Sequence, residues 1–403
     1  MTAVMRVRFN PFDAGFRRDP YPLYHRLRDA DPVHRALGMW VLTRHAHVRE
    51  VLRDREFSAG LIPTQVERRV DAGARIVRLG RASLVFTDNP EHARLRGLVN
   101  RAFTGVADLR PVVERATDDL MADAFARDVV DVVADLADPL PVAVLCAWMA
   151  LPADVAGRVA AWTHDIRFLL EPGLMKDDDV ARVTQVVDDF VLALADVITQ
   201  RRARPGDDLI SRLGAARTGG GDRLTDEEVA FVVIMSFVAG HETTTSLIGN
   251  ALLALLRHPG QAALLRARPQ LVASAVREAL RYDSPLQMTK RLATRDGEIG
   301  GRAIRAGEVI LLCLGAANRD PAVFAAPDAF DITRDTTGHV AFGDGLHGCL
   351  GGQLAQLQAQ VVLEGLARHP RPLRLRSDEP LVWQDHSQIV RGLTRLPVAW
   401  GSA

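Results

Sequence analysis

Apolar residues recur at three- and four-residue spacing along most of the chain, and this pattern predicts a helix-rich protein. The longest such run opens with a capping box at Thr225–Glu228 and continues to about Arg257, roughly 50 Å of helix at about 1.5 Å per residue. Other helices are predicted at residues 20–28, 48–52, 90–101, 112–126, 140–150, 153–170, 178–202, 259–267 and 271–282, and after Leu350, where Leu354, Leu357 and Val361 keep core spacing.

A smaller strand component accompanies the helices. Strands are predicted at residues 32–35, 39–43, 287–293, 298–299, 302–304 and 309–312, and a C-terminal pair joins 381–384 with 396–400. Residues 58–83 lack periodicity and are predicted to form a long loop of the kind that often contacts ligands. The fold class is therefore mainly α, an α+β protein with small sheets. No linker or repeat divides the sequence, so one domain is expected over residues 1–403.

Composition narrows the class of protein. Fifty basic residues balance fifty acidic ones, which argues against a nucleic-acid-binding protein. The three cysteines, Cys146, Cys313 and Cys349, give no disulfide framework, and the first two lie in apolar runs as core residues. The first ten residues lack an apolar signal segment, and no run of eighteen apolar residues occurs. A cytoplasmic protein is expected.

The segment Phe342–Gly351 carries the strongest chemical signal. Cys349 is expected at a helix N-terminus, where free amide N–H groups and the helix dipole favour a thiolate that can ligate iron. The glycines allow positive φ and leave room for a large flat cofactor. His347 is placed to hydrogen-bond an acidic group on the cofactor edge. The alternative is a buried structural cysteine in a glycine-rich turn.

A second signal lies inside the longest predicted helix, at Ala239–Thr244. Glycine and threonine weaken a helix there, and a threonine hydroxyl can bond back to a carbonyl four residues earlier and bend it. Apolar neighbours suggest that Glu242 is buried, so this acid beside a hydroxyl can deliver protons. The alternative is a packing kink with Glu242 paired to a distant arginine. His241 either adds a polar contact or points away.

Both segments resemble known motifs. The first reads F-G-x-G-x-H-x-C-x-G and resembles the haem-thiolate loop of the cytochrome P450 family at every specified position. The second is similar to that family's oxygen-activation motif, A-G-x-[DE]-T. The resemblance extends from Asp19-Pro20 to Arg391-Gly392-Leu393. At Phe103-Thr104-Gly105, relatives commonly have proline after the threonine, a departure that affects only a loop.

The resemblance implies a role for each matching residue. Cys349 is the metal ligand of haem b, which lies between the long central helix and the helix after the cysteine loop. Glu242 and Thr243 are the catalytic pair that relays protons and steadies oxygen. Other cofactor-binding residues line the haem or bind its propionates: Phe342, Gly343, Gly351, Ala239, Gly240, His92, Arg96, Arg291 and His347.

The family's E-x-x-R motif matches Glu278 and Arg281, one turn apart on one helix. By resemblance these two form a structural ion pair and are not catalytic. They are expected to contact Arg334 or another residue in the irregular stretch 318–335.

The resemblance implies a soluble, bacterial haem-thiolate monooxygenase. A monomer is expected. It would insert one oxygen atom from O2 into a hydrophobic or amphipathic small molecule, such as a secondary metabolite. Because no electron-transfer segment is fused, a ferredoxin and its reductase are expected partners, with Arg94 and Arg101 as candidate docking charges. Alternatives are a peroxide-driven peroxygenase, which the Glu242-Thr243 pair disfavours, and a non-enzymatic haem sensor or carrier. Expected substrate contacts are Phe86, Phe168, Val238, Leu286 and Ile389.

Overall fold

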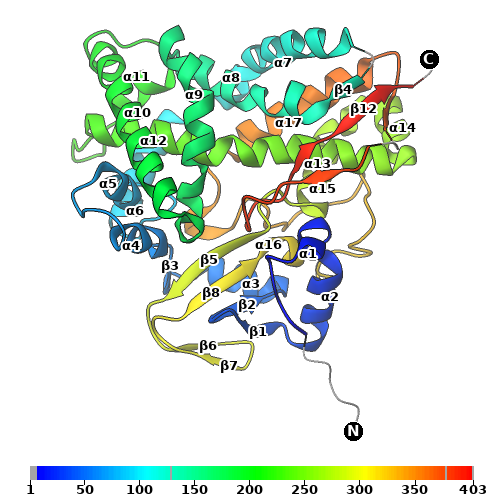
Figure 1. Ribbon diagram of the computed structural model, residues 1–403, viewed down its shortest axis with the longest axis horizontal. Coiled ribbons are helices and arrows are strands. Elements are labelled where there is room, and N and C mark those ends of the chain that lie inside the picture. Colours follow the sequence, from blue (N-terminus) through cyan, green and yellow to red (C-terminus); the bar gives the residue numbers. More distant parts are fainter. Residues whose placement is uncertain (1–6, 128, 377–378, 402–403) are drawn as a thin grey trace.

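The computed structural model describes residues 7–127, 129–376 and 379–401. Helices dominate this part of the chain and fill the upper part of Figure 1, whereas the largest sheet lies below them with the N-terminal helices beside it. The N-terminal half contains α1 (Ala14–Arg18), α2 (Tyr21–Ala30), α3 (His45–Arg53), α4 (Leu61–Glu67), α5 (Arg75–Arg81), α6 (Glu91–Ala102), η1 (Val106–Leu109), α7 (Arg110–Phe125), η2 (Val133–Ala137), α8 (Pro139–Trp148), α9 (Ala153–Ile166), η3 (Arg167–Leu170), η4 (Pro172–Leu174) and α10 (Asp177–Ala203).

The C-terminal half begins with the central helices and ends beside the cysteine loop. It contains α11 (Leu209–Ala215), α12 (Asp226–Gly240), α13 (Glu242–Arg257), α14 (Pro259–Ala267), η5 (Pro269–Leu271), α15 (Val272–Tyr282), α16 (Leu314–Ala317), η6 (Gly345–His347) and α17 (Gly352–Arg368). In Figure 1, α12 and α13 run end to end through the middle of the helical layer. Helix α17 packs against α13 and α15, so the segment that precedes α17 lies beside the central helices.

The strands form small sheets. The largest has the order β1-β2-β8-β5-β3, from β1 (Val33–Ala36), β2 (Met39–Leu42), β3 (Phe57–Ser58), β5 (Met288–Ala293) and β8 (Val309–Cys313). Strands β2 and β8 pair in parallel, with Val41 opposite Leu311. The other sheets are β4-β12-β9, β10-β11 and β6-β7, from β4 (Val129–Asp131), β6 (Gly297–Ile299), β7 (Arg302–Ile304), β9 (Leu373–Leu375), β10 (Val382–Trp383), β11 (Leu393–Arg395) and β12 (Pro397–Trp400). The predicted fold class, mainly α with small sheets, is confirmed.

Helix α12 shows how local sequence sets an element. The Thr225 side chain accepts from the Glu228 backbone N–H at 3.1 Å, and the Glu228 carboxylate accepts from the Thr225 N–H at 2.7 Å. This capping box satisfies two amide groups that the helix itself leaves unpaired. Residues Asp226–Arg257 are apolar and long enough to cross a membrane, but 72% of their most apolar window is buried inside the fold. A central core helix has this same composition.

Two predictions about elements need correction. Residues 58–83 are not one loop, because they contain α4 and α5. Each of these helices has seven residues, about two turns, so its apolar positions repeat too rarely to give a periodic signal. The predicted single helix over 225–257 is interrupted at His241, whose ψ of −79° separates α12 from α13.

The predicted C-terminal pairing is also wrong. Strand β10 pairs with β11, and β12 lies between β4 and β9. Val398 of β12, which is fully buried, faces Val130 of β4 in the pairing register. These partners are far apart in the chain, so local sequence could not identify them. The N-terminal segment in which no signal peptide is expected lies partly outside the described residues.

Candidate active site

The cysteine loop connects the end of an irregular stretch to α17. The Cys349 amide donates to the Phe342 carbonyl at 2.9 Å, which closes the loop. Gly343 has φ +72°, a conformation that favours glycine. A Cβ at Gly352 would lie 3.4 Å from the Phe342 ring, so the loop packs closely onto the first turn of α17.

The Cys349 side chain is accessible to solvent and yet largely surrounded by protein. Burial raises the pKa of the Cys349 thiol above its usual value. The amide groups of Gly351 and Gly352 and the Arg96 guanidinium act in the opposite direction. The backbone amides at the helix N-terminus therefore favour the thiolate as expected, but desolvation outweighs them in the absence of a metal ion. Coordination to a metal ion reverses the balance, since a coordinated thiol is deprotonated.

Three cationic or titratable side chains meet beside this loop. His92 is fully buried, and neither of its ring nitrogens has a hydrogen-bond partner among the described residues. Its ring centroid lies 4.4 Å from that of His347, whose Nδ1 is 3.2 Å from the Leu84 carbonyl. Arg96, four residues after His92 on α6, donates to the Gly348 carbonyl at 2.9 Å.

Arg291 of β5 joins this cluster from the large sheet. It is buried, and burial lowers the pKa of its guanidinium to about 10. Burial, reinforced by the Arg291 charge, lowers the pKa of His347 to about 4. The Asp88 carboxylate acts on Arg291, and it already accepts bonds from Ser58 and Ala59. The buried, underpaired donors of the cluster therefore fit an additional dianion, such as the two propionates of haem.

The break between α12 and α13 supplies the opposite wall. Thr243 donates its hydroxyl to the Ala239 carbonyl at 2.7 Å, the back-bond that its sequence position suggested. Ala239 is exposed although most of α12 is buried, so the surface of the helix is accessible at this point. The neighbouring Gly240 leaves ordinary contact distance, 3.5 Å, from an added Cβ to Leu145. Small residues on this wall and an accessible Cys349 suit a flat cofactor between α12–α13 and the loop before α17.

Glu242 is the first residue of α13, and its carboxylate contacts side chains from other segments of the chain. Its Oε1 lies 2.8 Å from His386 Nε2 and 3.6 Å from Arg167 Nε. The paired-arginine alternative for Glu242 is therefore present in the structure, together with a histidine that the sequence analysis missed. His386 lies 144 residues away in a loop without periodicity, so no sequence signal pointed to it.

His241 points toward the start of α8. Its Nε2 lies 3.0 Å from both the carbonyl and the carboxylate of Asp138, at the start of α8. The hydrogen bond from His241 lowers the pKa of Asp138. His241 thus anchors the break between α12 and α13 to α8.

The expected substrate residues lie on three sides of the fold. Phe86 and Val238 are buried in the main core, and Phe168 packs against that core. Leu286 forms an isolated bridge with Val390, and the amide of Gln287 donates to Ile389 at 2.7 Å. The structure thus brings the segments of Leu286 and Ile389 together.

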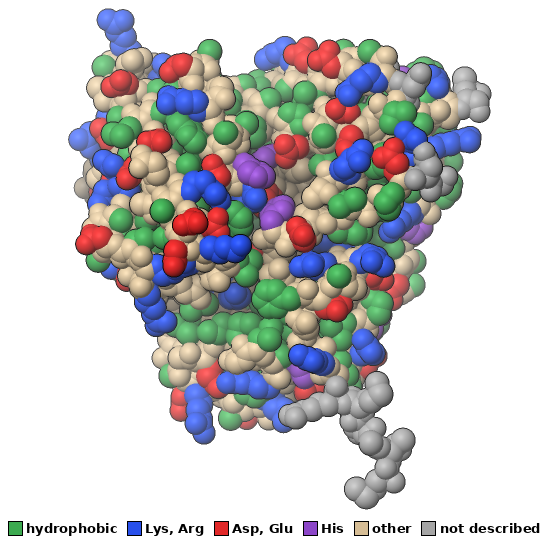
Figure 2. Space-filling view, viewed as in Figure 1, with side chains coloured by type: hydrophobic (Ala, Val, Ile, Leu, Met, Phe, Trp, Pro, Cys, Tyr) green, Lys and Arg blue, Asp and Glu red, His purple; other side chains and the backbone are tan. Residues whose placement is uncertain are grey.

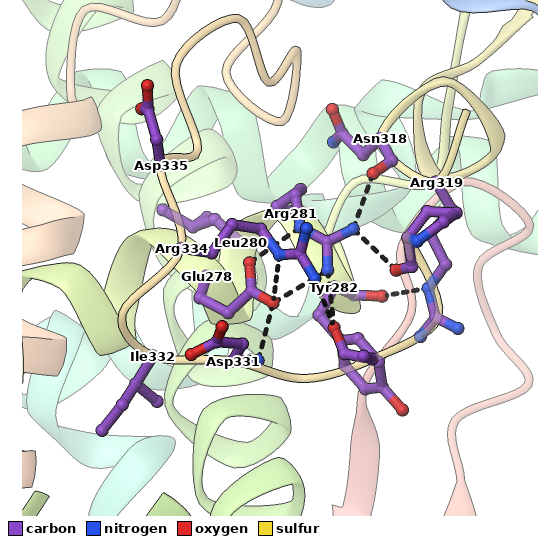
Figure 3. Close-up of polar contacts among 12 residues, drawn as sticks. Glu278, Leu280, Arg281, Tyr282, Asn318, Arg319, Asp331, Ile332, Arg334 and Asp335 are labelled. Atoms are coloured by element: carbon purple, nitrogen blue, oxygen red, sulfur yellow. Dashed lines mark hydrogen bonds and ion pairs between the residues drawn. The ribbon is translucent and has the colours of Figure 1, made fainter. Parts of the chain in front are cut away.

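Glu278 and Arg281 of α15 are completely buried and linked by two hydrogen bonds of 2.7 and 2.8 Å. Arg334, from the irregular segment before the cysteine loop, lies 3.3 Å from Glu278 (Figure 3). Arg281 also donates to the carbonyls of Asn318 and Pro327. The pair therefore fixes the course of the segment that leads to the site.

The two proposed docking arginines differ. Arg94 is engaged by Glu91, Asp222 and Glu228, so three carboxylates already surround its charge. It ties α6 to the N-terminus of α12. Arg101, at the other end of α6, is exposed.

This fold, with one accessible cysteine below a broken central helix, defines a haem-thiolate enzyme, and comparisons with known proteins agree. A family model described as Cytochrome P450 matches residues 165–369. The chain is 39% identical over 406 residues to Cytochrome P450 107B1 of Saccharopolyspora erythraea, with 97% of each protein covered. It is 38% identical over 398 residues to the vitamin D(3) 25-hydroxylase of Pseudonocardia autotrophica, covering 97% of this chain and 96% of that relative. The crystal structure of CalO2 superposes with a TM-score of 0.91 at 38% identity, covering 98% of this chain and 99% of that one.

The chain belongs to the cytochrome P450 family. It is a monooxygenase, and its cofactor is haem, the iron protoporphyrin of that family. The residues present fit this group, with a reachable thiol at Cys349 and buried donors at His92 and Arg291.

Proposed function

We propose that this enzyme inserts one oxygen atom from O2 into a hydrophobic or amphipathic small molecule of secondary metabolism. Electrons would come from a ferredoxin and its reductase in the cytoplasm. The observation that carries the proposal is the broken central helix, where Thr243 donates its hydroxyl to the Ala239 carbonyl and the preceding residue, Glu242, is held by His386. We also propose that the 403 residues form one domain and that the protein is a monomer.

The haem supplies oxygen activation when it is bound, and the chain's own residues do the rest. Cys349 would hold the iron, and His92, Arg96, Arg291 and His347 would hold the propionates. Thr243 would position a hydroxyl at the helix break, and Glu242 would carry protons inward. A carboxylate and a hydroxyl on adjacent residues suit a proton relay, because each can both accept and donate a proton.

Apolar side chains support the proposed substrate class. Phe86, Phe168 and Val238 come from the helical layer, whereas Leu286 and Ile389 come from segments joined across the sheet side. A relative of similar length is named for hydroxylating vitamin D(3), itself a large hydrophobic molecule. We therefore expect a substrate of comparable apolarity.

Turnover with a surrogate ferredoxin and reductase tests the proposal. A compound library is first screened for ligand-induced spin-state changes, and the ligands found are then supplied with O2 and NADPH. We expect an oxygenated product, and we expect Glu242→Gln and Thr243→Ala to divert electrons to peroxide. Product formed only with added peroxide would favour the peroxygenase, and ligand binding without any turnover would favour a haem sensor.

A further inference from the structure

The carboxylate of Glu242 is held by two cationic partners of unequal geometry. His386 Nε2 lies 2.8 Å from Oε1, a hydrogen-bond distance, whereas Arg167 Nε lies 3.6 Å from the same oxygen. The Nε group of Arg167 is buried and makes no hydrogen bond among the described residues. Arg167 therefore contributes charge, and His386 contributes the directional contact that fixes Glu242.

His386 lies at an open hollow, where its side chain retains 29% of its exposure and that of Glu242 retains 19%. The hollow is lined by Arg167, Phe168, Leu170, Glu171, Glu242, His386, Ser387 and Val390. Figure 2 shows histidine side chains grouped around a hollow near the middle of the molecular face drawn there. One partner of the acid can therefore exchange protons with bulk water.

The loop that carries His386 is fastened on its other side. Half-buried Glu171, after η3, accepts hydrogen bonds from the Ser387 hydroxyl and from the Gln388 amide at 3.0 Å. Desolvation raises the pKa of Glu171. These bonds hold the residues next to His386, so its ring is presented to Glu242 by a fixed backbone.

We propose that His386 is the proton-exchanging positioning residue for Glu242, an inference that rests on the proton-carrying role proposed for that acid. The Nε2–H of protonated His386 gives its proton to Glu242 Oε1, and the N–H bond breaks as the O–H bond forms. The imidazole then takes a proton from water in the hollow, and Glu242 passes its own proton inward. Each cycle consumes one solvent proton and restores both side chains.

Other charged groups face this pair. Arg167 and His164 come from the end of α9, Glu171 from the following turn, and Lys290 from β5 acts on Glu171. Arg167 cannot replace the imidazole as a proton carrier, because a guanidinium stays protonated. His164 interacts electrostatically with His386 and Glu242, whereas the hydrogen bond to Glu242 comes from His386.

The test compares His386→Gln and His386→Leu with the natural holoenzyme, using the surrogate redox system. Glutamine can still donate to Glu242 but cannot carry a proton, and leucine can do neither. General acid–base groups contribute about 100- to 10,000-fold, and since water can partly substitute, we expect both variants to lower kcat roughly tenfold. KM is expected to stay unchanged, while peroxide release and the solvent isotope effect rise. Asp385→Asn, which alters an exposed charge next in the chain, is the matched control and should match the natural enzyme.

The outcomes separate the inference from the proposed function. If Glu242→Gln impairs coupling but both His386 variants do not, the inference is wrong and the role of Glu242 stands. If His386→Gln restores full activity and His386→Leu does not, His386 is only an anchor and proton exchange is refuted. If Glu242→Gln has no effect, the acid's proposed role fails and the inference fails with it.

Nitrogen NMR can detect the contact between His386 and Glu242 without turnover. In histidine-labelled protein, reduced and bound to carbon monoxide so that it is diamagnetic, we expect His386 Nε2 to give the nitrogen chemical shift of a protonated ring nitrogen hydrogen-bonded to a carboxylate. That signal should persist in Asp385→Asn and disappear in Glu242→Ala. A signal that is missing from the natural protein, or unchanged in Glu242→Ala, would overturn the contact.

Discussion

At the scale of single residues, the site depends on side chains whose environment departs from that of the free amino acid. Cys349 is reachable but desolvated, His92 is buried with neither ring nitrogen hydrogen-bonded within the described part of the chain, and Arg291 is a buried cation. Each carries an energetic penalty in the isolated protein that a haem iron or propionate would offset. The sequence predicted these residue types from motif spacing, but their desolvation arises only from packing.

His339, near the cysteine loop, provides a pH-dependent prediction. Burial, together with the charges of Arg277 and Arg281, lowers the pKa of His339 to about 4, against a usual value of about 6.5. Below pH 6.5 the unfolded chain binds a proton there that the folded chain does not, so stability is lost as pH falls toward 4. Between pH 7 and pH 5 this costs about 2 kcal/mol.

Denaturant unfolding of the holoenzyme at both pH values measures that loss. In His339→Gln we expect the fall in unfolding free energy between pH 7 and pH 5 to be smaller by about 2 kcal/mol. An identical fall in both proteins would show that the histidine ionises equally in the folded and unfolded states.

At the scale of elements, long amphipathic helices and motif-bearing loops followed from sequence, whereas short helices and sheet partners did not. The segment of α12 and α13 could be predicted as helical because a capping box and 32 apolar-rich residues define it locally, although its break at His241 was not predicted. Helices α4 and α5 are too short for periodicity, and the position of β12 between β4 and β9 depends on packing of distant segments. For the same reason the sequence predicted Glu242 but not its partner His386.

The Glu278–Arg281 pair gives a prediction about how α15 holds the irregular segment before the site. Arg281→Ala leaves the fully buried Glu278 with Arg334 and the Asp331 amide as partners and frees the carbonyls of Asn318 and Pro327. Removing one partner of a buried pair costs about 3–5 kcal/mol, and we expect that loss in chemical unfolding.

Arg81→Ala is the matched control for this prediction. Arg81 pairs with Glu67 at 2.8 Å on the surface, where an ion pair contributes little, so unfolding should barely change. Equal stability of the two variants would mean that the buried pair does not hold the segment.

At the scale of the whole molecule, the chain has no net charge, so a charged partner would be recognised by local groups of charged side chains. Arg94 is occupied by three carboxylates, but Arg101 remains exposed on α6, the helix whose Arg96 bonds to the cysteine loop. Arg101 is therefore the better candidate for docking an acidic ferredoxin near the haem edge.

Charge reversal tests this docking surface. We expect Arg101→Glu to slow the first reduction of the haem by ferredoxin, most strongly at low ionic strength, because exposed charges steer association. Arg204→Glu is the control, because Arg204 lies at the exposed C-terminal cap of α10 and outside the helices beside the cysteine loop. The haem of this variant should be reduced at the same rate as that of the natural enzyme. Stopped-flow reduction that is the same for all three proteins would remove Arg101 from the docking surface.

The central claim is that Cys349 ligates haem iron as a thiolate, and the absorbance of the reduced carbon-monoxide complex tests it most directly. The natural protein should show the red-shifted Soret band of thiolate ligation, and Cys349→His should lose that band while keeping haem. Purified protein without haem, or a spectrum unchanged by the histidine substitution, would contradict the account.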